Sequence, residues 1–275
     1  MNVAAVLLPA PASAPALSRR RLAGVALVGA VAAFAIVGPW LIQADPARQN
    51  LMQPLAPIGG DYLLGTDHLG RSTLARLAYA SRLSLSLSLL TVFTAALAGG
   101  AAGLVAAWRG GWSERVLLGI TDGILALPGL LLVLLMRALV PGSFWPVYIG
   151  LSLVLSVEYF RLVRAAASTV LASPQVEAAR LLGFDAIHIM RRHVVPEVAP
   201  LVVTLMAFGA STVVMALAAL SFIGSGFAPP TAEWGGMLTE LLPYNVEAPA
   251  QLLLPSGMIF VTVIGLQLLG GRDPR

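Results

Sequence analysis

Side chains that could bind a partner are concentrated in one polar connection, residues 165–199, of an otherwise apolar chain. The connection contains a Glu-Ala-Ala triplet at 177–179, then Gly183, then an arginine pair at 191–192, and it ends near Pro196. Carboxylate and guanidinium groups form charge-assisted hydrogen bonds with groups of opposite charge. A chain that keeps one compact, arginine-rich, helix-forming connection between apolar segments is expected to present it to a soluble partner.

Groups that could perform catalysis or bind a metal do not converge in the sequence. There is no cysteine, which excludes disulfides, thiolate metal sites and cysteine nucleophiles. There is no lysine either, so the phosphate-binding Gly-x-x-x-x-Gly-Lys-Ser/Thr motif cannot occur. His188 and His193 are five residues apart, about 140° around a helix of 3.6 residues per turn, so they are predicted not to share a face. We therefore expect no catalytic residue and no metal site, and energy must come from a partner or an ion gradient.

The polar connection is predicted to form two short helices separated by a glycine. Ser173 is a good N-cap, and the proline after it is tolerated at the first helical position. Gly183 can take the left-handed conformation that ends the first helix. A second helical stretch is expected over 185–193, broken by Pro196 before the next apolar segment starts at about Pro200. Two interpretations remain open: an amphipathic connector with its arginines on anionic lipid, or a docking element for a soluble partner.

The remaining sequence is apolar enough to require a lipid environment. Of 275 residues, 58% are hydrophobic and only 11% are charged. The mean hydropathy is +0.86, so polar side chains are too few to cover a soluble globule. The net charge of +4 comes from arginine alone. Because the arginines are scattered at the ends of apolar segments, they indicate membrane orientation and lipid contact, and not nucleic-acid binding.

Six segments are long and apolar enough to cross a bilayer, which takes about 20 residues each. The sequence thus predicts an all-α polytopic membrane protein with six transmembrane helices, at 22–42, 83–107, 116–140, 145–164, 200–223 and 251–270. The pair Pro128-Gly129 is expected to kink the third span without ending it. Gly99 and Gly103 give the second span a small-residue face suited to close helix packing.

The distribution of arginine predicts the orientation of these spans. The inside arginines, if the N-terminus is cytoplasmic, are Arg19, Arg20, Arg21, Arg109, Arg115, Arg161, Arg164, Arg180, Arg191, Arg192, Arg272 and Arg275. The outside arginines are Arg48, Arg71, Arg76 and Arg82, and Arg137 lies within the third span. Because twelve arginines then lie on the inside and only four on the outside, both termini and the connection 165–199 are predicted to be cytoplasmic.

The predicted organisation has four parts. Residues 1–21 are expected to be a disordered cytoplasmic tail, because much of this stretch is rich in Ala, Pro and Ser. Residues 22–42 are the first span, 43–82 an extracytoplasmic segment, and 83–271 a five-helix core domain that contains the connection 165–199. A cleaved targeting signal is the alternative for the N-terminal part. It is disfavoured because the apolar run is long and no small-x-small site ends it.

Ionisable residues inside spans are candidates for function. Glu158 and Arg161 are spaced i,i+3 on one helix face and are predicted to form a local ion pair, with a substrate contact as the alternative. Asp122 could cap a helix or bond across helices, and both roles stay open.

Three ordered stretches resemble the permease subunits of binding-protein-dependent ABC importers, in the dipeptide, oligopeptide and nickel branch. The connection is similar to the EAA loop of that family, whose pattern is EAA, three residues, G, nine residues, I, one residue, LP. His193 and Val195 stand at the Ile and Leu positions, a form common in this branch. Residues 64–71 resemble the stretch before the core spans, and residues 220–235 resemble the block after the fifth span.

The resemblance implies a type I ABC importer permease fold without ATPase activity of its own. It also implies that the connection docks on a cytoplasmic ATPase subunit and transmits its closure to the spans. The residues expected to provide this coupling are Glu177, Ala178, Ala179, Arg180, Gly183, Arg191, Arg192 and Pro196. The implied partners are two cytoplasmic ABC ATPase subunits that carry ATP and Mg, a second homologous permease subunit in a heterodimer, and an extracytoplasmic solute-binding protein. This chain itself is expected to bind no cofactor.

The outer segments 43–82 and 224–250 have two open interpretations. They either cap the helix bundle, with Trp234 as an interfacial anchor, or dock the solute-binding protein. The residues named for docking are Asp67, Arg71, Glu233 and Trp234.

The expected function is that of a permease subunit in the bacterial cytoplasmic (inner) membrane, importing dipeptides, oligopeptides or nickel, free or chelated. A gradient-driven secondary transporter is the alternative. It would predict inverted repeats and broken helices around midplane charges, and no internal repeat is evident. A polytopic membrane enzyme would need clustered catalytic groups, which the sequence does not show.

Overall fold

The computed structural model describes residues 19–140 and 143–271, and most of these lie in helices. Within this part of the chain the only β pairings are two isolated bridges between Gly59 and Tyr62 and between Thr66 and Ser72. The all-α prediction is confirmed. The elements in chain order are α1 (Arg19–Ile42), α2 (Thr73–Arg109), α3 (Gly111–Leu125), α4 (Gly129–Leu139), α5 (Phe144–Leu171), α6 (Pro174–Leu181), α7 (Ala186–Ile189), the π turn η1 (Met190–Val194), α8 (Val195–Phe222), α9 (Trp234–Leu241), the 3-10 turn η2 (Leu242–Tyr244) and α10 (Pro249–Gly270).

Five helices in the described residues are long and apolar enough to cross a bilayer, and a bent pair is the sixth candidate. The five are α1, α2, α5, α10 and the helix Ala186–Phe222, which joins α7, η1 and α8. The bent pair is α3 and α4, which meet at 77°. The kink predicted at Pro128-Gly129 is present and is sharper than expected, because the helix is interrupted at residues 126–128. Proline lacks an amide donor and its ring excludes a preceding helical turn, so the chain turns a corner here.

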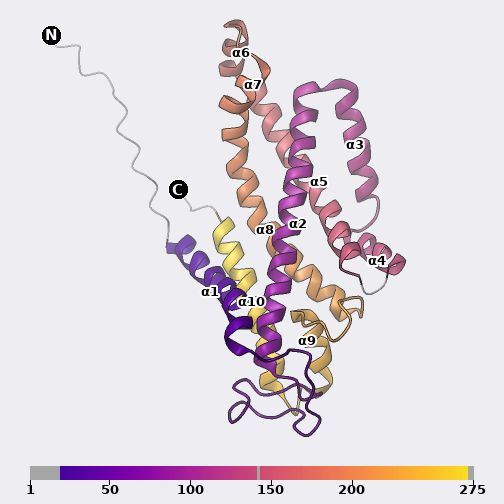
Figure 1. The fold of residues 1–275 in the computed structure, drawn as a ribbon. Coiled ribbons are helices and arrows are strands. Elements are labelled where there is room, and N and C mark those ends of the chain that lie inside the picture. The colour runs from indigo at the N-terminus through magenta and orange to yellow at the C-terminus, as the bar shows by residue number, and fades with distance from the viewer. Residues whose placement is uncertain (1–18, 141–142, 272–275) are drawn as a thin grey trace, which may run out of the picture.

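Helix α2 is the long axis around which the others are arranged (Figure 1). Helix α5 packs along it, α8 contacts both, and α1 and α10 lie side by side on another flank of α2. One buried cluster joins α2, α5 and α8 through residues such as Leu87, Leu155 and Val213. A second cluster joins α1, α2 and α9 and includes Val31 and Trp234. The molecule carries α6 and α7 at one end and the loop 43–72 with α9 at the other (Figure 1).

Two glycines let α2 approach α5 closely, as the sequence predicted. A Cβ on Gly99 would lie 2.1 Å from the carbonyl oxygen of Ser156, and one on Gly103 would lie 2.8 Å from that of Phe160. Both neighbours are backbone atoms, which cannot rotate away. Gly100 differs, because the nearest atom to its Cβ would be a Val163 methyl carbon at 3.8 Å, an ordinary contact.

Gly99→Ala is expected to lower the free energy of unfolding by roughly 1–3 kcal/mol, since a methyl group there forces the two helix backbones apart. Thermal unfolding of the purified protein in detergent measures this effect. Gly100→Ala, one position along the same helix, is the matched control and should unfold at the wild-type temperature. Equal destabilisation by the two substitutions would contradict the packing explanation.

Pro196 does not break the helical segment, contrary to the prediction, and the fifth span begins well before Pro200. Helix runs without interruption over Ala186–Phe222. Immediately before Pro196 the helix has a π turn, in which the amide of Val195 donates to the carbonyl oxygen of Met190. The wider turn leaves room for the proline ring, so the helix continues.

The helices extend past the boundaries drawn from apolar sequence. Helix α1 begins at Arg19, so the end of the predicted tail 1–21 is helical, while residues 1–18 lie outside the described residues. Helix α2 begins at Thr73, capped by Ser72, so the boundary predicted between 82 and 83 falls inside a helix. Hydropathy detects the lipid-facing part of a helix, whereas hydrogen bonding and packing carry the helix beyond it.

Candidate coupling site and outer cavity

The coupling segment, which we define as residues 172–199, projects from the end of the molecule opposite the loop 43–72 (Figure 1). Helix α6 begins at Pro174 after the N-cap Ser173, as predicted, although the Ser173 side chain makes no capping hydrogen bond. Helix α7 is capped by Asp185, whose carboxylate accepts a hydrogen bond from the amide of His188 at 3.0 Å. A side-chain cap therefore marks the start of α7 and not that of α6.

Gly183 ends α6 in the predicted left-handed conformation, with φ of +80°. Its amide donates to the carbonyl oxygen of Arg180, and the amide of Phe184 donates to that of Ala179. These two bonds form a Schellman motif, which satisfies two carbonyls at the helix end and fixes the direction of the following chain. The angle between α6 and α7 thus depends on one residue that favours positive φ.

The inner face of the coupling segment packs on the chain itself. Val176, Ala179 and Ile189 form a small buried cluster with Trp108 at the end of α2. The Arg180 guanidinium lies over the Trp108 ring, 5.7 Å from its centroid. Ala179 was expected to face the partner and instead faces inward, because it lies on the side of α6 that covers this cluster.

The outer face carries four exposed apolar side chains, which we call the coupling tip: Leu181, Leu182, Phe184 and Ile187. Leu181 is 85% exposed and Leu182 77% exposed. Exposed apolar patches of this kind mark interaction sites. Neither leucine is among the residues predicted from the sequence, although their position directly before the helix-ending glycine is a usable signal.

Other residues named for coupling also reach the surface. They are Glu177, Ala178, Arg180, Gly183, Arg191, Arg192 and Pro196, all exposed. The structure thus brings most of the named residues together on one projecting segment. Their role in coupling stays a prediction.

His188 and His193 lie closer together than predicted, with ring centroids 6.4 Å apart. The π turn between them advances by a smaller angle per residue than an α-helix does, so residues five apart approach one face. The His188 ring is stacked on Phe184 at 4.3 Å between centroids.

Two arginines and two carboxylates form a buried ion cluster at the end of the bundle that carries the loop 43–72 and α9. Arg71 donates from Nε to Asp67 at 2.6 Å and from Nη2 to Glu240 at 2.5 Å. Arg76 donates from Nη1 to the same Glu240 oxygen at 2.6 Å and also bonds Asp67. Asp67, Arg71 and Arg76 are each 1% exposed. The cluster ties the loop 43–72 and the start of α2 to α9.

The ion cluster changes the acidity of Asp67. Burial alone would raise the pKa of its carboxyl group, but the positive charges of Arg76 and Arg71, with hydrogen bonds from both, lower that pKa below its ordinary value. Asp67 is therefore held as a carboxylate.

Glu233 and Trp234 are also buried. The Glu233 carboxylate accepts from the Ser221 hydroxyl at 2.7 Å and from the amides of Gly235 and Gly236 at 2.9 Å each, so it caps α9 and links it to α8. The Trp234 ring is completely buried in the cluster between α1, α2 and α9.

The four residues named for docking therefore have a different role in the structure. Asp67, Arg71, Glu233 and Trp234 present no accessible side chain to a partner, and Trp234 is not an interfacial anchor either. Their charged groups form ion pairs and hydrogen bonds within the chain, and the Trp234 ring packs in the core. The bundle-capping interpretation of the outer segments fits these contacts.

Asp67, His68 and Glu240 are the one group of three potential metal ligands found in the described residues. Two arginines already bond the carboxylate oxygens of this group. Their positive charges disfavour a cation there, so the donor set fits an ion-pair cluster and not a metal site. His68 instead stacks on Tyr244, with centroids 5.5 Å apart.

Two ion pairs join α3 to α5. Arg161 donates to Asp122 at 2.8 Å, and Arg164 donates to Glu114 at 2.9 Å. The predicted Glu158–Arg161 pair is wrong, because Arg161 reaches across to the neighbouring helix. Glu158 is exposed and has no ion pair within residues 19–140 and 143–271.

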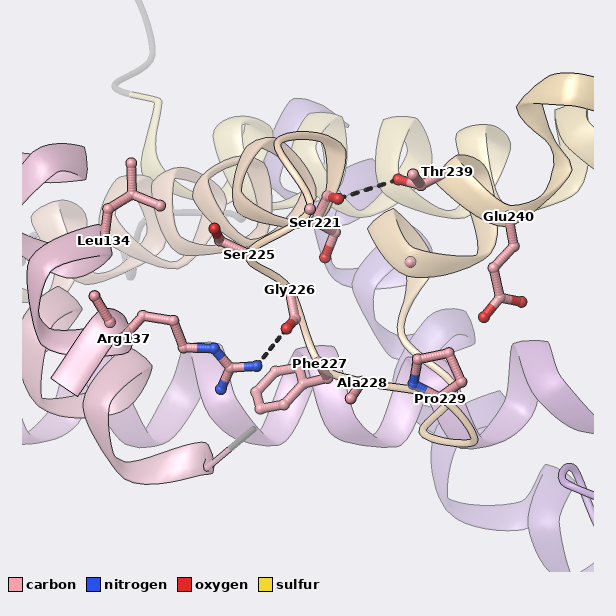
Figure 2. A pocket seen from close by; sticks show the side chains of 13 residues that line it. Leu134, Arg137, Ser221, Ser225, Gly226, Phe227, Ala228, Pro229, Thr239 and Glu240 are labelled. Atoms are coloured by element: carbon pink, nitrogen blue, oxygen red, sulfur yellow. Dashed lines mark hydrogen bonds between the residues drawn. The ribbon is translucent and has the colours of Figure 1, made fainter. Parts of the chain in front are cut away.

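A cavity of about 530 Å³ lies between α4, the loop after α8 and α9. Figure 2 shows Arg137 on one side of it and Glu240 on the other. The Arg137 guanidinium donates to the carbonyl oxygens of Ser143, at 2.5 Å, and of Gly226. It also lies 5.8 Å from the centroid of the Phe227 ring. The sequence places Arg137 within a span but does not predict the cavity, because the loop that completes its wall is distant in sequence.

Residues 99–270 match the family model described as the binding-protein-dependent transport system inner membrane component. A protein of Brucella suis biovar 1, whose name describes it as a peptide transport system permease, is 32% identical to this chain. The match covers 97% of this chain and 92% of the Brucella protein. The dipeptide transport system permease protein DppC of Haemophilus influenzae is 31% identical over 92% of this chain and 88% of its own length.

A solved structure shares the fold. It is an inward-facing form of the MetNI methionine ABC transporter, and one of its chains superposes with a TM-score of 0.54 at 19% identity. The match covers 68% of this chain and 89% of that chain. The helical arrangement is therefore that of an ABC importer permease.

Proposed function

This chain belongs to the family of binding-protein-dependent transport system inner membrane components, and on that basis we propose that it is the permease subunit of an ATP-driven peptide importer. It is an integral membrane protein with five or six spans in its described residues. A gradient-driven transporter is set aside, because members of this family work in binding-protein-dependent ABC systems.

The observation that carries the proposal is the apolar coupling tip on a rigid, capped segment. Leu181 and Leu182 are exposed at the far end of that segment, beyond the Trp108 contact that fixes its base. Exposure of these apolar side chains to water is unfavourable in free energy, and their burial in the groove of a soluble partner would remove this cost. The proposed partner is a cytoplasmic ATPase subunit, and the charged residues around the tip would supply specificity.

The proposed complex has two such ATPase subunits, which bind the ATP and Mg, a second permease subunit and an extracytoplasmic solute-binding protein. The chain has no lysine, so it cannot build a lysine-containing phosphate loop of its own. The energy must therefore come from outside the chain, and family membership favours an ATPase partner over an ion gradient.

The proposed orientation places the coupling segment and both chain ends in the cytoplasm, in the inner membrane. The arginine bias of twelve against four supports it. So does the fold, because Arg21 near the start of α1 and Leu269 near the end of α10 line one cavity together with Pro196 and Pro200 of the coupling side.

The proposed substrate is a peptide. Both relatives described above carry names that refer to peptides or dipeptides, and neither name refers to nickel.

Reconstitution tests this function. The complete complex in liposomes, with binding protein and a radiolabelled dipeptide, should accumulate the peptide only when ATP is supplied on the ATPase side. Accumulation driven by an ion gradient without ATP would contradict the proposal.

In the same assay, Gly183→Val should lower peptide uptake per ATP hydrolysed by about tenfold, equivalent to about 1.4 kcal/mol. A β-branched residue is strained at positive φ by roughly 1–3 kcal/mol, so α6 must change direction and displace the tip. Gly183→Asn is the matched control, because asparagine tolerates this conformation, and it should stay close to wild type. Normal uptake and normal hydrolysis with valine would count against the coupling role.

A further inference from the structure

Glu158 lies near the middle of the membrane-spanning part of the chain. A Cβ on Gly99 would lie 2.1 Å from the carbonyl oxygen of Ser156 and 3.0 Å from the Cβ of Tyr159, so this part of α5 is level with Gly99 of α2. Gly99 precedes Arg109, the last residue of α2, by ten residues, which is about 15 Å of helix. In the proposed orientation Arg109 is at the cytoplasmic surface, and the hydrocarbon core of a bilayer is about 30 Å thick. Glu158 is therefore close to the centre of the bilayer.

The exposed face of α5 from this depth towards the coupling segment is polar. Between residues 157 and 168 its exposed residues recur at helical spacing and none is a large apolar residue: Glu158, Arg161, Ala165 and Ser168. Asp122 of α3 is exposed beside them and accepts a hydrogen bond from Arg161 at 2.8 Å. The side chain of Asp122 is 65% exposed and that of Arg161 is 52% exposed. We call these five residues the polar face.

The exposed side of α2 at the same depth has the opposite character. All its exposed residues between 89 and 105 are apolar: Leu89, Leu90, Phe93, Leu97, Ala98, Ala101 and Val105. That composition suits contact with lipid tails, whereas ionisable groups inside a membrane normally face protein or a water-filled cavity. The polar face is therefore not a lipid-contacting surface.

The polar face carries one more negative than positive charge. Arg161 is paired with Asp122, and Arg164, the next arginine of α5, is paired with Glu114. Glu158 has no ion pair within residues 19–140 and 143–271. A carboxylate at this depth is costly unless water or a group of opposite charge reaches it.

We propose that the polar face lines a water-filled path between this chain and the second permease subunit, and that Glu158 makes this path selective for cations. The small side chains of Ala165 and Ser168 leave room for water beside the charged groups. The inference rests on the proposed function and specifies its substrates further: peptides with a net positive charge are favoured over anionic peptides of the same size.

The absence of cysteine from the chain allows a direct test. A single introduced cysteine reacts with a charged, water-soluble methanethiosulfonate where water reaches it, because the thiolate is the reactive form. Ala126 is exposed in the break between α3 and α4. The residues that flank the break contact α5 on either side of Glu158, Asp122 at Arg161 and Gly129 at Val154. Ala126 is therefore level with Glu158, and Ala126→Cys is the probe.

Leu97→Cys is the matched control, because Leu97 lies at the same depth on the apolar side of α2 and is 65% exposed. The measurement is the labelling rate of each cysteine in the complete reconstituted complex, with a trimethylammonium and with a sulfonate methanethiosulfonate, read by mass spectrometry of this subunit. Ala126→Cys should react roughly tenfold faster or more, since apolar surroundings raise the pKa of a thiol and each unit lowers the thiolate fraction tenfold.

In the Ala126→Cys background, Glu158→Gln should lower the ratio of the cationic to the anionic labelling rate by about tenfold, because loss of one charge changes the two rates in opposite directions. Glu158→Asp keeps the charge and should keep the ratio. Without the introduced cysteine, Glu158→Gln should lower the uptake of lysylalanine relative to dialanine by about threefold. Both peptides are supplied at concentrations that saturate the binding protein.

Equal labelling of Ala126→Cys and Leu97→Cys would overturn the path and show that lipid or a dry subunit contact covers the polar face. Ratios left unchanged by Glu158→Gln would overturn the role of Glu158. ATP-driven uptake by the wild-type complex is measured on the same liposomes. If it transports neither peptide, the proposed function is overturned, and this result is distinct from a failure of the labelling test.

Discussion

Leu181→Glu is expected to reduce ATP-driven peptide uptake by roughly 30-fold or more, because central apolar contacts of an interface contribute about 2 kcal/mol or more each. Leu181 is 85% exposed at the coupling tip, so the substitution leaves the fold of this chain intact. In a complex the new carboxylate would be buried against an apolar groove without a partner, which is costly. Two measurements follow: recovery of the ATPase subunits on the purified permease, and uptake in liposomes.

Leu181→Met is the matched control, since it keeps the apolar character and the approximate volume of the side chain. It should retain near wild-type recovery and uptake. Full recovery of ATPase subunits and normal uptake with glutamate at this position would show that the tip is not the contact surface.

Arg76→Gln is expected to lower the free energy of unfolding by about 3–5 kcal/mol, the usual cost of removing one partner from a buried ion cluster. The guanidinium bonds both Asp67 and Glu240 in a nearly inaccessible site. Its removal leaves two carboxylates to share Arg71. Thermal unfolding in detergent measures the change. Arg82→Gln, an exposed arginine on the same helix, is the control and should shift stability by less than about 0.5 kcal/mol.

The ion cluster also predicts how this difference varies with pH. The pKa of Asp67 is lowered in the folded protein, where burial opposes the shift and Arg76 and Arg71 cause it. A group with a lowered pKa contributes stability that is fully present above its ordinary value of 3.8 and is lost as the pH falls through the folded value. The difference in unfolding free energy between wild type and Arg76→Gln should therefore begin to shrink as the pH falls below 3.8. A constant difference down to pH 3 would contradict this account.

Features set by local sequence were predictable. The apolar stretches identified the spans, and Gly183 was recognised as the end of a helix because a left-handed position there has few alternatives to glycine. The projecting coupling segment followed from its charges and from the resemblance to importer permeases.

Features set by contacts between distant residues were not predictable. Arg71 and Glu240 are 169 positions apart in the chain, and nothing in their local sequence indicates the buried cluster that joins them. Charged residues are usually exposed, which is why Asp67, Arg71 and Glu233 were assigned to a docking surface. The orientation of Ala179 was not predictable either. Only the packing of α6 on Trp108 decides which side of that short helix is covered.

The uninterrupted helix Ala186–Phe222 has a mechanical consequence. Its 37 residues span about 55 Å at 1.5 Å per residue. It runs from the base of the coupling tip to Ser221, which lies in the wall of the cavity. Gly226, whose carbonyl oxygen accepts a hydrogen bond from Arg137, follows the end of the helix by four residues. A partner bound to the coupling tip would therefore contact one end of a continuous helix whose other end lies at the cavity beside Arg137, and this helix contains the π turn immediately before Pro196. In the proposed complex, a tilt of this helix by a few degrees at the coupling tip would be amplified along its length and would move the wall of the cavity at its far end.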